Sequence, residues 1–191
     1  MIIGICGNLG QGKTCTLTFL GHLFWRSGVT IYGNYVLKFP FTPVDSFDTI
    51  GEIRNGIFLG DELWAWADSR GFGLRQNRAI AAILLKSRKH GLDIFFTAQH
   101  FKQIDIRIRR MTDMFILPDL DKRSMICKVH FYNYFYDRVR KPIQYDATKI
   151  FGLYDTTEEV EDIKGFEAEK AIQKIKEFEA LAKAKALGIQ L

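Results

Sequence analysis

The chain has 191 residues, of which 47% are apolar, 14% aromatic and 26% charged, and its net charge is +5. This composition excludes disorder and low complexity, and the length suits one α/β domain with an appendage. No apolar stretch reaches the ~18 residues of a membrane-spanning helix, and no basic region precedes the apolar start. The sequence therefore predicts neither secretion nor stable membrane insertion.

Strands and helices alternate along the first half of the chain. Apolar runs and helical spacings predict, in order, a strand at 1–5, a helix ending near 27, a strand at 29–37, a loop at 39–43, a short helix at 46–54 and a strand at 57–60. The early strands are apolar on both faces. This pattern is typical of a mainly parallel sheet with helices on each side.

The second half continues the alternation and then ends in a β-hairpin and a helical extension. It predicts a helical face at 79–84 that Gly91 stops, strands at 93–98 and 114–117, the latter closed by Pro118, and a terminal β-hairpin formed by 125–136 and 142–145. We divide the chain into a core at 1–157 and an amphipathic helical extension at 158–191. That extension either packs back on the core or faces a partner or another subunit.

A glycine-rich segment between the first strand and the first helix fits the pattern GxxxxGK[ST]. Its glycines turn backbone N–H groups toward a β-phosphate, and the helix N-terminus adds its positive dipole end. The Lys13 ammonium is expected to reach the β- and γ-phosphates of a nucleotide, and the Thr14 hydroxyl to ligate Mg²⁺. The predicted nucleotide-binding residues are Gly7, Asn8, Leu9, Gly10, Gln11, Gly12, Lys13, Thr14 and Cys15.

Two carboxylates follow the apolar strand at 57–60, as in a Walker B element. Asp61 is expected to hold Mg²⁺ through its water shell, and Glu62 to polarise the attacking water as a general base. Gln99 follows the strand at 93–98, at the edge that faces the nucleotide in a sheet of this kind. It is interpreted either as a contact to the γ-phosphate and the water or as an ordinary loop amide.

Basic residues gather in the middle of the chain, with 16 Lys and Arg against 6 Asp and Glu between residues 70 and 141. Such a segment suits a polyanion, although a solvated basic face explains it equally well. Within it, Arg88 and Arg109 are candidates for an arginine finger that reaches a neighbouring subunit. Each can also be a surface or DNA-contacting cation. Trp64, Trp66 and Phe72 are interpreted as packing residues, with base stacking as the alternative.

The three cysteines form no CxxC pair, and the four histidines have no ligand-like spacing. Packed, reduced thiols are expected, and a zinc site is not.

The segment from Ile57 to Leu117 resembles the FtsK–HerA superfamily of ATP-driven pumps. The resemblance rests on Asp61-Glu62, Ser87-Arg88-Lys89-His90-Gly91, Thr97-Ala98-Gln99 and Ile108-Arg109 with Asp113, in that order. Among its members, the chain is similar to viral genome-packaging ATPases and to zonular occludens toxin-like proteins of filamentous phages. Residues 151–158 resemble the segment that closes the domain in the latter group.

The resemblance implies a RecA-like P-loop core, ATP with Mg²⁺ as cofactors, and a homo-oligomeric ring, often a hexamer, that moves double-stranded DNA. Lys13, Thr14, Asp61, Glu62 and Gln99 match the family's catalytic positions, and Arg88 and Arg109 match its arginines. The first hypothesis is a viral genome-packaging ATPase in the cytoplasm of the infected host cell, docked on the procapsid through capsid or vertex proteins.

Two alternatives remain. One is a virion assembly or extrusion ATPase that acts with membrane partners; the lack of a downstream membrane-spanning segment in the sequence favours packaging over it. The other is a P-loop scaffold that binds nucleotide and hardly hydrolyses it, against which Glu62 and Gln99 argue.

Overall fold

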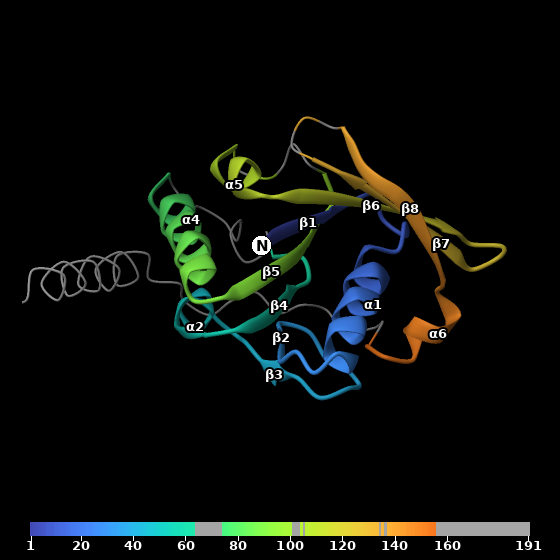
Figure 1. The fold of residues 1–191 in the computed structure, drawn as a ribbon, viewed down its shortest axis with the longest axis horizontal. Coiled ribbons are helices and arrows are strands. Elements are labelled where there is room, and N and C mark those ends of the chain that lie inside the picture. Colours follow the sequence, from blue (N-terminus) through green and yellow to red (C-terminus); the bar gives the residue numbers. More distant parts are fainter. Residues whose placement is uncertain (64–73, 101–103, 105, 134, 136, 156–191) are drawn as a thin grey trace, which may run out of the picture.

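The computed structural model describes residues 1–63, 74–100, 104, 106–133, 135 and 137–155. Within them, one eight-stranded sheet forms the centre, with the strand order β3-β2-β4-β5-β1-β6-β7-β8 (Figure 1). The pairings from β3 to β6 are parallel, and β7 and β8 are added antiparallel to them. The predicted mainly parallel α/β sheet is therefore confirmed.

The strands are β1 (Ile2–Cys6), β2 (Ile31–Gly33), β3 (Thr42–Pro43), β4 (Gly56–Gly60), β5 (Leu92–Ala98), β6 (Met114–Asp121), β7 (Ile126–Tyr132) and β8 (Arg138–Asp146). The helices are α1 (Lys13–Arg26), α2 (Phe47–Glu52), α4 (Leu74–Lys89), α5 (Ile106–Met111) and α6 (Thr148–Phe151).

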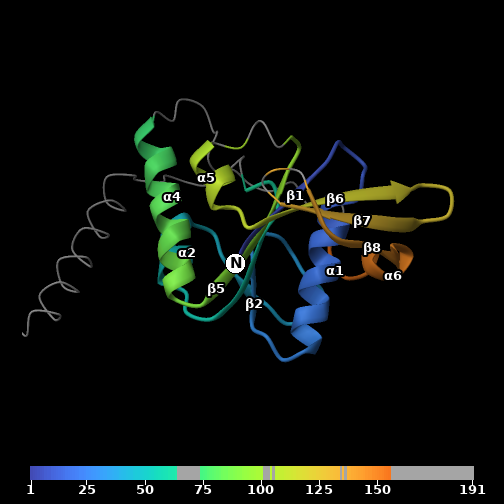
Figure 2. The same cartoon turned by 45° about the horizontal axis from the view of Figure 1, so that its top comes forward.

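Helices cover the sheet from two sides, with α2, α4 and α5 on one face and α1 and α6 on the other (Figure 2). Two apolar clusters fill these layers. Phe58 and Phe96 belong to the first cluster, and Leu59 and Phe95 to the second. Because successive strand residues point to opposite faces, a strand buried on both sides must be apolar throughout, and all five residues of β1 are buried.

Three central strands end side by side. Cys6 at the end of β1 pairs with Ala98 at the end of β5, and Gly60 of β4 pairs with Phe96 of β5. The residues that follow these strands, Gly7, Asp61 and Gln99, therefore emerge at one edge of the sheet, which we call the carboxyl edge. The opposite edge, where the parallel strands begin, is the amino edge.

Three predicted boundaries are wrong, two of them near β2. The strand expected at 29–37 is only Ile31–Gly33, because the chain then leaves the sheet to cover α1, burying Tyr35, Leu37 and Phe39. Part of the expected loop at 39–43 pairs with β2 as β3.

The strand expected to end before Pro118 continues to Asp121. β1 pairs with β6 only as far as Ile116, so beyond it β6 has a neighbour on one side alone. Proline, which lacks a backbone N–H, is tolerated at such a position. The predicted terminal hairpin is confirmed as β7 and β8.

The predicted extension at 158–191 and the aromatic residues at 64, 66 and 72 lie outside the described residues. Among the helices that the structure describes, none is long and apolar enough to cross a membrane.

Candidate nucleotide-binding site

The glycine-rich segment forms a loop between β1 and α1, as its sequence predicts. Gly10 and Gly12 have positive φ angles of 75° and 86°, a left-handed conformation that costs a glycine little. Gly12 is the N-cap of α1 and has no side chain with which to cap it. The first N–H groups of the helix are therefore offered to an anion rather than to a side chain.

The loop is held by contacts among its own residues. The Lys13 Nζ donates to the Asn8 carbonyl oxygen at 3.2 Å, and the Asn8 N–H donates to Gln11 Oε1 at 2.6 Å. Lys13 is only 8% exposed. Its ammonium thus lies against the backbone of the loop, as expected for a residue that binds phosphates held inside it.

Asp61 is fixed at the carboxyl edge by its side chain and by its backbone. Its carboxylate accepts hydrogen bonds from the Thr14 hydroxyl, at 3.0 Å to Oδ2, and from the Thr97 hydroxyl, at 2.7 Å to Oδ1. The Asn34 side chain accepts from the Asp61 N–H at 2.7 Å and donates to its carbonyl oxygen at 2.8 Å. The loop, β4 and β5 are therefore joined through one carboxylate.

Burial raises the pKa of Asp61 above its ordinary value, because the carboxylate is almost out of contact with water. Hydrogen bonds from Thr97 and Thr14 act in the opposite direction, as does the charge of Lys13, while the neighbouring Glu62 raises the pKa further. The hydroxyl donors orient the carboxylate but bring no positive charge, so a bound cation would stabilise its ionised form.

The chemistry of these donors fits Mg²⁺. The ion prefers hard oxygen ligands and is usually held by one or two protein groups together with water and substrate phosphates. The Thr14 hydroxyl and the Asp61 carboxylate supply two such oxygens on adjoining elements. The two residues that the sequence assigned to the metal are thus brought together.

Glu62 follows Asp61 in a left-handed conformation, with φ at 44°. This conformation is uncommon for a residue other than glycine, and such strain is typical of functional sites. The Glu62 N–H donates to Thr97 Oγ1 at 2.7 Å, and the residue is exposed. Gln99 is also exposed and follows β5, next to the strand that leads into the loop. Both lie at the carboxyl edge.

The two candidate arginines are placed differently. Arg88, at the end of α4, donates to Asp113 Oδ1 at 2.8 Å, and the other oxygen of Asp113 accepts from the Ile2 N–H at 2.7 Å. This contact lies where β1 and β6 begin, at the amino edge. Arg109 lies in α5, the helix that leads into the start of β6. The structure does not bring either arginine to the loop of its own chain, so a finger role for them requires a neighbouring subunit.

Thr97 and Asn34 are site residues that the sequence analysis did not assign. A signal for Thr97 was present, since it is a polar residue in an otherwise apolar strand, two positions before Gln99. Asn34 gave no such signal, because its role depends on β2 lying beside β4.

The first turns of α1 are tied to the antiparallel strands. The Thr16 hydroxyl lies 2.9 Å from the Tyr145 hydroxyl of β8, and the Tyr145 ring stacks on Phe19 with the centroids 4.2 Å apart. The helix that carries the phosphate-binding loop is therefore held by β8 as well as by the parallel sheet.

The cysteines are free and buried, as predicted. Burial raises the pKa of Cys6 to about 12 and that of Cys15 to about 11, so both thiols stay protonated near neutral pH. Among the described residues, no group of His, Cys, Asp and Glu is arranged to hold a metal ion by itself.

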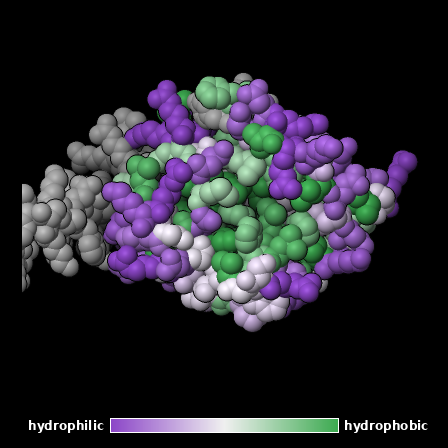
Figure 3. Space-filling model, in the orientation of Figure 1, coloured by the Kyte–Doolittle hydropathy of each residue, from purple (hydrophilic) through white to green (hydrophobic). Residues whose placement is uncertain are grey.

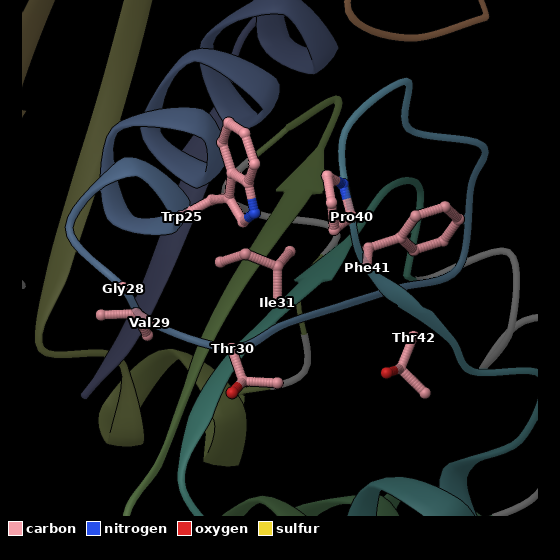
Figure 4. Close-up of a pocket in the computed structure, with 8 residues that line it drawn as sticks. All are labelled: Trp25, Gly28, Val29, Thr30, Ile31, Pro40, Phe41 and Thr42. Atoms are coloured by element: carbon pink, nitrogen blue, oxygen red, sulfur yellow. The ribbon is translucent and has the colours of Figure 1, made fainter.

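A hollow of about 350 Å³ lies away from this site, between the end of α1 and the start of β2 (Figure 4). Trp25 and Phe41 lie on either side of it, and Ile31 lies between them. Its lining contains no lysine or arginine. Because a polyphosphate needs cations or backbone N–H groups, the phosphate-binding loop fits a nucleotide and this hollow does not.

The fold and the loop together define a RecA-like P-loop NTPase fold. The N-terminal domain of zonular occludens toxin from Neisseria meningitidis matches with a TM-score of 0.56 and 20% identity, over 81% of this chain and 98% of that chain. The ATPase domain of G40P matches with a TM-score of 0.55 and 10% identity, over 82% and 84%. The genome packaging NTPase B204 from Sulfolobus turreted icosahedral virus 2, solved in complex with ATPγS, matches with a TM-score of 0.51 and 9% identity, over 75% and 96%.

The expected resemblance to zonular occludens toxin and to viral packaging ATPases is therefore confirmed at the level of the fold. The chain matches no family model and no curated protein.

Proposed function

We propose that this chain is a Mg²⁺-dependent ATPase that moves double-stranded DNA as a homo-oligomeric ring and packages a viral genome. The observation that carries the proposal is the cluster of Thr14, Asp61 and Thr97, which joins the phosphate-binding loop to the two strands that carry Glu62 and Gln99. A solvent-exposed Glu62 next to this cluster suits hydrolysis better than mere binding.

In this proposal each residue has one task. Lys13 and the N–H groups of the loop bind the β- and γ-phosphates, and Thr14 and Asp61 hold the metal. Glu62 takes a proton from the attacking water, and Gln99 orients that water in line with the bond between the γ-phosphorus and the oxygen of the leaving ADP. When bound, Mg²⁺ neutralises charge on the phosphates. Arg88 and Arg109 remain the candidates for a finger in the active site of a neighbouring subunit.

Exposed apolar residues support an oligomer. Figure 3 shows apolar side chains gathered in the middle of one face and polar ones at its rim. The described residues with exposed apolar side chains include Leu23 and Phe24 of α1, at 45% and 37% exposure. Apolar surface of this kind is typical of protein interfaces.

DNA as the partner is supported by charge. The segment from residue 70 to 141 carries 16 basic against 6 acidic residues, and a DNA backbone is bound mainly by such cations. We place the protein in the cytoplasm of the infected cell, at the procapsid, with capsid or vertex proteins as further partners.

The alternative is an ATPase that drives virion assembly or extrusion with membrane partners. It is favoured by the match to the zonular occludens toxin domain, which covers 98% of that domain.

Steady-state ATP hydrolysis with and without linear duplex DNA, measured across protein concentration, tests the proposal. A DNA-dependent increase that rises cooperatively with concentration supports a ring-shaped translocase. Hydrolysis that ignores DNA but accompanies co-fractionation with membranes supports the extrusion ATPase. Binding of ATP without phosphate release under either condition overturns both.

A further inference from the structure

The β6–β7 hairpin lies against the phosphate-binding loop. A Cβ atom built on Gly12 would lie 3.4 Å from the Leu120 Cβ and 3.6 Å from the Cys127 Sγ. A Cβ atom built on Gly10 would lie 3.1 Å from the Lys122 Nζ and 3.5 Å from its Cε. The hairpin thus places an ammonium group beside the tip of the loop.

The Lys122 ammonium group takes no part in the hydrogen bonds that close the turn of the hairpin. Asp121 Oδ1 accepts from the Arg123 N–H at 2.9 Å, and its Oδ2 accepts from the Ser124 hydroxyl at 2.7 Å. The turn is closed by the Met125 N–H, which donates to the Asp121 carbonyl oxygen at 2.8 Å. Across the part of the chain that the structure describes, Lys122 forms no ion pair. The turn therefore forms without the Lys122 amine.

Lys122 differs in this respect from Lys13. Lys13 is buried and donates to the loop backbone, whereas Lys122 is exposed and reaches the loop from another element. A phosphate chain held by the loop carries several negative charges close together. Lys13 approaches this loop from the first turn of α1. Lys122 belongs to the hairpin and lies beside Gly10.

We propose that Lys122 is a second phosphate-binding lysine, which contacts the polyphosphate of a nucleoside triphosphate from the β6–β7 hairpin of the same chain. This inference rests on the proposed function, because it requires that the loop binds ATP. It adds an element that the GxxxxGK[ST] pattern does not contain, and it makes nucleotide affinity depend on where the hairpin lies.

The test is equilibrium binding of a fluorescent ATP analogue to the full chain, titrated at low protein concentration with Mg²⁺ present. Lys122→Met keeps the apolar stem and removes the charge, Lys122→Arg keeps the charge, and Arg123→Met is the matched control at the neighbouring position. Because a hydrogen bond to a charged group is lost, Lys122→Met should weaken binding roughly tenfold. Lys122→Arg should restore most of the affinity, and Arg123→Met should change it less than about twofold.

Repeating the titration with adenosine monophosphate separates a phosphate contact from a structural role. The loss caused by Lys122→Met should be much smaller for the monophosphate than for the triphosphate. Equal losses for both nucleotides, or equal affinities of Lys122→Met and Arg123→Met, overturn the inference. If the unaltered chain and Lys13→Ala bind the triphosphate equally poorly, it is the proposed function that fails.

Discussion

Both edges of the sheet hold charged groups, but these groups have different kinds of partner at the two edges. At the amino edge, charges meet charges near solvent: the N-terminal amine pairs with Asp93, and Arg88 pairs with Asp113. At the carboxyl edge, Asp61 is 8% exposed and accepts hydrogen bonds from hydroxyl groups.

At the amino edge these charges are paired with opposite charges, whereas at the carboxyl edge the charge of Asp61 meets hydroxyl donors. An ion pair neutralises its own charge, so these two pairs leave little charge for a ligand. Hydroxyl donors orient a carboxylate without neutralising it, and a metal ion or a phosphate-bound cation can complete the neutralisation. Substitutions at the carboxyl edge should therefore alter nucleotide chemistry. Substitutions at the amino edge should alter mainly stability, unless Arg88 acts as a finger in a neighbouring subunit.

The largest effect is expected for Glu62→Gln. Replacing the proposed general base by an amide should lower kcat for ATP hydrolysis by roughly 10²–10⁴-fold, because proton transfer from the attacking water is lost. Affinity for ATP should hardly change. Steady-state phosphate release and equilibrium ATP binding measure the two quantities, and a kcat equal to that of the unaltered chain would show that water is activated elsewhere.

Thr97→Val comes next. Valine matches the volume of threonine but removes the hydroxyl that donates to Asp61 and accepts from the Glu62 N–H. Asp61, which is buried, would lose one of its two hydroxyl donors, and the part-buried Glu62 N–H would lose its acceptor. The free energy of unfolding should therefore fall by about 2 kcal/mol, and kcat should fall as well. Thr97→Ser keeps the hydroxyl and serves as the control in urea unfolding. The prediction fails if the valine variant is as stable as the serine variant.

A smaller effect is expected at two glycines with the same backbone conformation. Gly12 and Gly28 have φ angles of 86° and 85°, so alanine at either position should cost about 1 kcal/mol in strain. A Cβ at Gly28 meets nothing within 4 Å, whereas one at Gly12 meets Leu120 and Cys127. Both variants should lose stability in thermal unfolding, but only Gly12→Ala should also lose ATP affinity severalfold. Equal affinities in the two variants would contradict this.

Asp113→Asn should have the smallest effect. It makes the same chemical change as Glu62→Gln, but at the amino edge. Since the pair with Arg88 is partly exposed, the loss should be below about 1 kcal/mol of unfolding free energy, with kcat within about twofold of the unaltered value. The amide oxygen still accepts from the Ile2 N–H. A large fall in kcat without loss of stability would instead place Asp113 and Arg88 in the active site of a neighbouring subunit.

How much of the site the sequence predicts depends on how far apart its parts lie in the chain. The phosphate-binding loop is contiguous, so its residues could be assigned by spacing. Asp61 and Gln99 each end an apolar strand, which is enough to place them at the carboxyl edge of a parallel sheet.

Asn34 and Lys122 could not be found in this way. Asn34 contacts Asp61 because β2 pairs with β4, and Lys122 reaches Gly10 because β6 continues past Pro118 into a hairpin. Strand order and strand length are set by tertiary packing and pairing, which local residue patterns do not record. For the same reason the strand at 29–37 was predicted too long, since its apolar residues pack on α1 instead of extending the sheet.

The contact between Tyr145 and Thr16 has a mechanical consequence. Within the described sheet, β8 pairs with β7 alone, so it is the outermost strand. Its tyrosine is nevertheless attached to the first turn of the helix that begins the nucleotide site. A load applied to this outer strand would be transmitted to that turn directly, without first deforming the parallel strands. A force applied to β8 would therefore change the rate at which nucleotide is released from the site.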